Sequence, residues 1–309
     1  MRLGDNSFGR LARLLSMDTR ILAGSGGFIA FILFIMLPSI IALYVAGLFW
    51  MPQSHQAVIT LQYIHPGTSI YETFHNEYIG TVKSLTDMVT GFWAGFPMLV
   101  IASLVASSFI SGERGNGTFN LLATKPIRRY ELVLSKVIGF SLLSLVALAV
   151  VQTINVLVVA ASFYNGLGAG KVWDALTDSS RYIGYYTLVS WLYLISILGL
   201  TLLISTQTKK VYIVVLGVVG YYIGLAITSQ IITGLIGGSI AQEISTILLN
   251  ADFSYHANIV LHQWVYGTLE NIPYKGITPS YPTSLTALTI IPILLIVTTL
   301  VIMERKDLD

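Results

Sequence analysis

Apolar residues dominate six long stretches of the chain, and polar residues gather in the segments between them. Each stretch is long enough to cross about 30 Å of hydrocarbon as a helix of about 20 residues. The six runs cover residues 26–48, 87–110, 137–163, 183–205, 211–235 and 283–303. The pattern predicts an all-α polytopic membrane protein with six transmembrane helices, organised as one integrated domain over residues 1–309.

The segment before the first run repeats apolar positions with the period of a helix over residues 7–22. One side of this helix is apolar, and the other carries Arg10, Arg13 and Arg20. Such a helix lies in the inner headgroup layer, with its arginines near anionic lipids. Two interpretations remain open, a simple membrane anchor and an elbow helix that also helps to seat a partner protein.

Two long segments on the opposite side of the membrane, residues 49–86 and 236–282, carry aromatic residues and little charge. We expect them to fold onto the outer membrane surface as short helices.

Composition supports the membrane assignment, because 54% of residues are hydrophobic and only 10% are charged. A soluble domain usually carries about 25% charged residues, so the solvent of this chain is largely lipid. No basic tract is long enough to follow a nucleic-acid backbone, and no nucleic-acid partner is expected. The chain has no cysteine, which excludes disulfides, thiol catalysis and thiolate metal sites.

The positive charges indicate an orientation. With six spans both termini lie on one side, and that side holds 13 of the 17 Lys and Arg residues. Cytoplasmic loops carry an excess of Lys and Arg. The chain is therefore predicted to lie in the cell membrane with both termini in the cytoplasm.

No Asp, Glu, Lys, Arg or His falls in the middle of any run. Charges at such depth are costly and mark ion paths, so their absence argues against proton- or sodium-coupled pumps and voltage-gated channels. Polar clusters near Gln152 and Gln230 favour hydrogen bonding between helices over substrate contact. Gly220 and Gly224 form a close-packing pattern, either within the chain or across a dimer.

A charged, turn-rich stretch between the second and third runs, which we call the island, covers residues 113–129. Gly112, Gly115 and Gly117 are predicted to break the second helix as it leaves the membrane. Thr118 is a suitable N-cap for a short helix over residues 118–124.

Phe119, Leu121 and Leu122 would give this short helix an apolar side. It ends at Lys125-Pro126, because the residue before a proline avoids the helical region. Arg128 follows at the headgroup level, and forces on the short helix would pass into the second and third spans. The alternative is an ordinary surface loop with arginines reaching the headgroups.

The order Glu-Arg-Gly-x-Gly-Thr-Phe-x-x-Leu-Leu from Glu113, followed by Pro126, Arg128 and Lys136, resembles the signature of type-2 ABC exporter permeases. The closest resemblance is to permeases with separate ATPase subunits, including the one that serves copper-site assembly of nitrous-oxide reductase. The outer segment 49–86 is longer than that comparison predicts.

The resemblance implies that the segment between spans two and three is a coupling helix that docks on an ABC ATPase. Carried over to this chain, the ATPase-coupling residues are Glu113, Gly117, Thr118, Phe119, Leu121, Leu122, Pro126, Arg128 and Lys136. Glu113 would pair with a basic residue of the ATPase or cap a local helix end.

The implied function is a non-catalytic permease subunit, in which ATP and Mg are bound by the partner ATPase. A second permease, either a copy or a homologue, would complete the transporter within membrane lipid. The alternative is a structural or mechanotransmitting subunit of a larger complex, without transport of its own.

The chain itself offers no cofactor or metal site to sequence inspection. Gly168-Ala169-Gly170-Lys171 lacks the first glycine and the hydroxyl residue of a phosphate-binding loop. The five histidines lie in the predicted outer segments without the spacing of a metal site.

Overall fold

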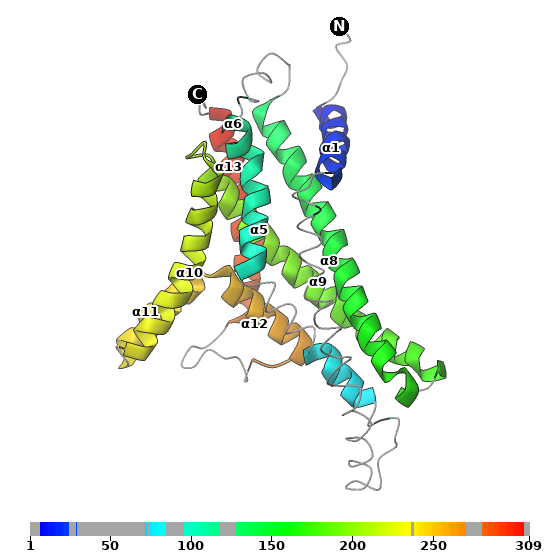
Figure 1. Cartoon of the computed structure of the whole chain (residues 1–309). Coiled ribbons are helices and arrows are strands. Elements are labelled where there is room, and N and C mark those ends of the chain that lie inside the picture. Colours follow the sequence, from blue (N-terminus) through cyan, green and yellow to red (C-terminus); the bar gives the residue numbers. More distant parts are fainter. Residues whose placement is uncertain are drawn as a thin grey trace. The chain divides into compact units, whose positions relative to one another are not determined.

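The structure is a computed structural model that describes residues 7–24, 29, 72, 75–84, 96–115, 117, 128–167, 169–235, 238–269 and 280–305. Across these ranges the chain forms helices joined by short turns, with no strand, which confirms the predicted all-α class. Figure 1 shows the helices in chain order, from α1 in blue to α13 in red. The first predicted span, 26–48, lies outside the described residues apart from Ile29.

Helices occupy the positions of the other predicted spans. Their bounds differ from most of the predicted ones, because backbone hydrogen bonds and not hydropathy define a helix. The second position holds α5 (Phe96–Ser107), a π-helix η2 (Ser108–Gly112) and α6 (Glu113–Gly115). The remaining positions hold α8 (Arg129–Leu167), α9 (Ala169–Ser205), α10 (Val211–Leu235) and α13 (Tyr281–Arg305).

Shorter helices lie in the described parts of the predicted surface segments. Helix α1 (Ser7–Gly24) covers the amphipathic N-terminal segment. Residues 75–84 are helical, and α11 (Gly238–Asn250) and α12 (Phe253–Tyr266) lie in the second outer segment. Helix α12 begins at Asp252, whose carboxylate accepts from the Ser254 amide, and ends at Gly267 with a left-handed φ of 72°, which are the expected signals at the two ends of a helix.

Three helices in the described part of the chain are long and apolar enough to cross a membrane. They are Arg129–Ala160, Trp173–Ser205 and Tyr281–Arg305, and Val211–Leu225 is a shorter apolar helix. A multi-pass membrane protein follows from these helices, while the count of six spans stays a prediction.

The chain divides into two compact units. The first contains Met1–Phe31, Ala94–Ser144 and Val189–Asp309. Within it, α10 packs against α5 and α11, and α12 packs against α13. Helix α9 lies close to α13 at Gly199, where an added Cβ would lie 3.1 Å from the Pro292 carbonyl oxygen.

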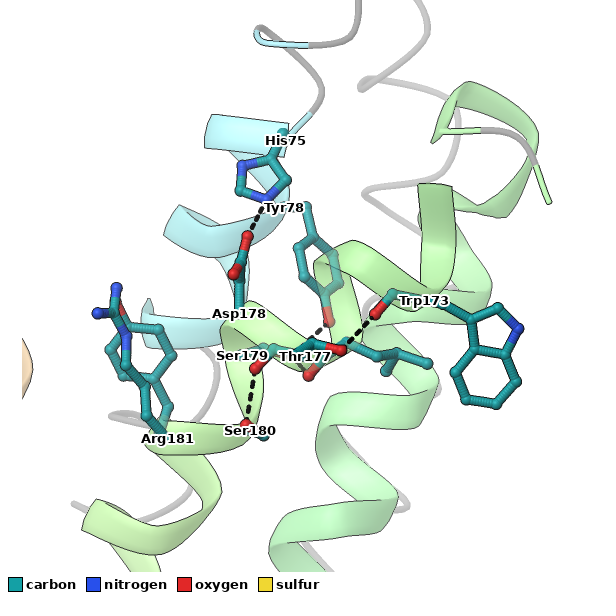
Figure 2. A network of polar contacts seen from close by, with 10 residues as sticks. His75, Tyr78, Trp173, Thr177, Asp178, Ser179, Ser180 and Arg181 are labelled. Carbon is teal, nitrogen blue, oxygen red and sulfur yellow. Dashed lines mark hydrogen bonds and ion pairs between the residues drawn. The ribbon is translucent and has the colours of Figure 1, made fainter. Parts of the chain in front are cut away.

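The second unit contains Ile32–Trp93 and Leu145–Leu188. Its described core joins the helix at 75–84 to α9 (Figure 2). The fully buried Tyr78 hydroxyl lies 2.9 Å from Ser179 Oγ, and His75 Nε2 lies 3.0 Å from Asp178 Oδ2. These contacts hold an outer-segment helix against the part of α9 that precedes the predicted fourth span.

Candidate functional site

The structure describes the two ends of the island, and both belong to the first unit. Of the predicted coupling residues, the structure describes Glu113, Gly117, Arg128 and Lys136. The remaining predictions, which are Thr118, Phe119, Leu121, Leu122 and Pro126, fall outside the described residues. The described residues therefore lie where the chain enters and leaves the island, a region that we call the base of the island.

The entry to the island is a helix that ends later than predicted. Gly112 does not break the helix, because it is the last residue of η2 and the chain continues through α6 to Gly115. Gly117 then has a φ of 71°, a left-handed conformation that glycine adopts without steric cost. Its amide donates to the Arg114 carbonyl at 3.3 Å, so Gly115 and Gly117, but not Gly112, mark the end of the helix.

Glu113 is held by a residue of its own chain. Lys136 Nζ, in the second turn of α8, donates to Glu113 Oε1. Only 14% of the Lys136 side chain and 20% of the Glu113 side chain are exposed. The sequence predicted that Glu113 pairs with the ATPase or caps a helix end. The structure shows an ion pair within the chain that joins the start of the island to the helix that follows it, and the contact with an ATPase stays a prediction.

The other oxygen of this carboxylate, Glu113 Oε2, is buried and has no hydrogen-bond partner among the described residues. A carboxylate has about four lone-pair sites across its two oxygens. Glu113 thus keeps acceptor capacity beyond its bond to Lys136.

Arg114 and Ser111 bind the turn between α9 and α10, residues 206–210. Arg114 donates to the Thr206 carbonyl at 3.1 Å. Ser111 Oγ lies 2.7 Å from the Thr208 carbonyl oxygen and 3.2 Å from that of Ser205. Burial lowers the pKa of Arg114, but a guanidinium in a protein stays protonated, so the bond remains charge-assisted.

The exit from the island is capped at the start of α8. The Arg128 amide lies 3.4 Å from Glu131 Oε2, which is the reciprocal half of a capping box, with Arg128 at the N-cap and Glu131 three residues later. The Arg128 side chain is exposed and lies over the Tyr130 ring at 5.9 Å. Glu131 is buried, so its role is to fix the first turn of α8.

Helix α1 also contacts this region. The buried Asp18 carboxylate accepts from Ser135 Oγ, one residue before Lys136 on α8. Adjacent residues of α8 thus hold α1 and α6. This contact ties the N-terminal helix to the base of the island, which favours the elbow interpretation over a membrane anchor alone.

Sequence inspection missed Ser111, Arg114, Asp18 and Ser135. Asp18 had a visible signal, because it is an acid within a basic amphipathic helix, and Arg114 lies within the Glu-Arg-Gly order of the motif. All four residues act through partners on different elements. The described residues contain no group of three or more metal-ligating side chains. What the contacts provide is a mechanical joint between α1, α6, α8 and the α9–α10 turn.

Comparison with known proteins gives one family. A search of curated proteins finds no significant match to the chain. The family model described as ABC-2 family transporter protein matches residues 25–308. That match includes the island and every predicted span, and it confirms the resemblance to type-2 ABC permeases. The chain therefore belongs to the ABC-2 family of transporter proteins, as a membrane permease subunit of an ABC transporter.

Proposed function

We propose that this permease couples ATP hydrolysis on a separate ABC ATPase subunit to export of a substrate, and that the island is the segment that docks on the ATPase. The observation that carries the proposal is the joint at the base of the island. Lys136 holds Glu113, and Arg114 holds the α9–α10 turn. A displacement of the island would therefore reach α5, α8, α9 and α10 together.

The orientation and the assembly belong to the same proposal. The excess of Lys and Arg on the island side supports a cytoplasmic island and cytoplasmic termini in the cell membrane. ATP and Mg would be bound by the ATPase. A second permease, either a copy or a homologue, would present a second island to the second ATPase.

The docking contact would be formed by the short helix predicted over residues 118–124. Phe119 and Leu122 are spaced to share one face of that helix. Burying each side chain fully would contribute about 1.5–3 kcal/mol. This apolar contact, rather than the Glu113–Lys136 pair, is expected to supply most of the affinity.

The test is co-purification of an ABC ATPase with tagged variants from the host membrane in mild detergent. Leu122→Asp places a charge in the contact and is expected to remove most of the ATPase from the complex. Asn120→Asp adds the same charge to the same segment at a polar position and is the matched control. Thermal unfolding of each permease checks that the fold is intact.

Two results would contradict the proposal. The first is full retention of the ATPase by Leu122→Asp, which would exclude this helix as the docking element. The second is a stable complex that contains no nucleotide-binding chain, which would favour a structural subunit.

A further inference from the structure

We infer that Ser111 and Arg114 are positioning residues that make the α9–α10 turn move together with the island. The inference rests on the proposed function and extends it to a second pair of spans. Neither residue was predicted as a coupling residue. Both side chains bind carbonyls at the end of α9, and the backbone of α6 lies close to the turn.

The end of α9 is capped by residues from a distant part of the chain. The last four carbonyls of a helix lack partners within it. After Ser205, the chain supplies local bonds such as the Gln207 amide to the Ile204 carbonyl at 3.0 Å. The Ser205 and Thr208 carbonyls accept from Ser111, and the Thr206 carbonyl accepts from Arg114. These donors precede their acceptors by 92 to 97 residues.

The contact is buried at the bond from Ser111 to Ser205 and partly buried at the bond from Arg114 to Thr206. Ser111, Ser205 and Thr206 are fully buried. A Cβ added at Gly115 would lie 3.1 Å from the Lys209 carbonyl oxygen, so the backbone of α6 lies directly against the turn. Buried hydrogen bonds to carbonyls are costly to break without replacement. A shift of α6 would therefore draw the turn with it.

The turn transmits such a shift into two helices. It follows α9 without a break, and α10 begins at Val211, one residue after the turn. On the island side, η2 and α6 continue α5. A π-helix is often found at functional sites, and here it carries Ser111 to the turn. The side chains of Gln207, Lys209 and Lys210 in the turn are exposed.

The inference is tested by hydrogen–deuterium exchange on the purified permease–ATPase complex, with and without ATP plus vanadate. In the unsubstituted complex, nucleotide should change hydrogen exchange both in residues 114–125 of the island and in the turn segment, residues 203–212. In the Ser111→Ala/Arg114→Gln variant, the change in the island should persist and the change in the turn segment should be lost.

Three further variants make the result specific. Arg114→Lys keeps a charged donor and should restore part of the response. Ser108→Ala is the matched control, because Ser108 Oγ bonds only to the Val105 carbonyl of its own helix among the described residues, at 2.6 Å. The single substitution Ser111→Ala removes fewer contacts than the double variant, and it replaces the double variant in the experiment if the latter does not fold. Its turn response should be smaller than that of Ser108→Ala.

The outcomes separate the two proposals. A nucleotide response in the turn that survives removal of both side chains would overturn the inference, since the contacts would then be a structural cap only. A response in the island without one in the turn of the unsubstituted complex would overturn it as well. An island that does not respond in any complex would overturn the proposed docking function, and the inference with it.

Discussion

At the residue scale, the Glu113–Lys136 pair is expected to stabilise the base of the island without any contribution from the ATPase. Both side chains are mostly buried. Removing one partner of a buried pair leaves an uncompensated charge, whereas removing both is often tolerated. Glu113→Gln and Lys136→Met should each destabilise the permease, and the double variant should cost less than the sum.

The expected coupling energy is about 1–3 kcal/mol. It is measured by a double-mutant cycle of reversible unfolding in mixed micelles on the permease without its ATPase. Additive effects of the two substitutions would show that the pair contributes no coupling. Glu113 would then be better explained as a residue kept for the ATPase.

His256 is a second residue whose surroundings have a measurable consequence. It is 2% exposed, with Nδ1 lying 3.0 Å from Ser284 Oγ and Nε2 lying 3.0 Å from the Asn250 carbonyl oxygen. Burial lowers its pKa, although the bond to Asn250 and the charge of Asp252 oppose the shift. A neutral ring satisfies both contacts by donating to Asn250 and accepting from Ser284.

The sign of the pH dependence follows from this shift. The unfolded chain takes up a proton near the ordinary histidine pKa of about 6.5, before the folded chain does. Stability should therefore fall as pH drops below about 6.5, until the folded pKa is passed. Burial raises the pKa of Asp252 above the ordinary value. Asp252 therefore acts in the opposite direction, because the folded state takes up its proton first as the pH falls.

The prediction is that His256→Gln lowers the slope of melting temperature against pH between about 7.5 and 5.5. Melting of the detergent-solubilised permease at several pH values measures it. His75→Gln is the comparison, because His75 lies at an ion pair with the exposed Asp178 rather than in a buried site. An unchanged slope in the His256 variant would contradict the assignment.

At the element scale, the crossing of α9 and α13 depends on one missing side chain. A Cβ at Gly199 would lie 3.1 Å from the Pro292 carbonyl oxygen and 3.2 Å from Leu295 Cβ. Backbone atoms cannot swing away, so Gly199→Ala should cost about 1–3 kcal/mol by overpacking. It should lower the melting temperature.

Gly184 provides the matched control on the same helix. A Cβ there meets nothing within 4 Å in the part of the chain that the structure describes. Gly184→Ala should therefore be neutral or stabilise the helix by up to about 1 kcal/mol. Equal melting temperatures for the two variants would mean that α13 shifts without cost at the crossing.

The elements also show what sequence patterns can define. Helix α10 has the bounds of the fifth predicted span, residues 211–235, because Lys210 ends the polar turn just before the apolar run. Helices α8 and α9 begin earlier than the predicted spans at residues 137 and 183. Hydropathy locates the membrane boundary, whereas backbone hydrogen bonds continue past it into polar sequence.

At the candidate site too, the sequence predicts some features and not others. Glu113 and Lys136 were both predicted as coupling residues, but the bond between them was not, because they lie 23 residues apart on different elements. Ser111 and Arg114 were missed because their partners are backbone carbonyls, which leave no trace in residue type. Sequence patterns identified the segment, and tertiary packing determined the contacts within it.

At the scale of the whole molecule, the apolar surface requires lipid or a partner. Large apolar side chains are exposed along the predicted spans, including Val146 on α8, Leu216 on α10 and Ile293 on α13. Soluble monomeric proteins rarely expose such extended apolar surfaces to water. On α10, added Cβ atoms at Gly220 and Gly224 meet nothing within 4 Å among the described residues, so no described helix packs closely on this pattern.

The last prediction concerns the path of the chain through the membrane. The absence of native cysteine allows single introduced cysteines to be labelled without background. If six spans place both termini in the cytoplasm, impermeant maleimide should label cysteines at Ser54, Lys171 and Asn271 in intact cells. Cysteines at Ser7 and Asp309 should react only after the membrane is opened. The prediction rests on the 13 of 17 basic residues that one arrangement places inside. Protection of Asn271 together with labelling of Asp309 in intact cells would reverse the final span, and the α13 end would then lie on the side opposite to the island.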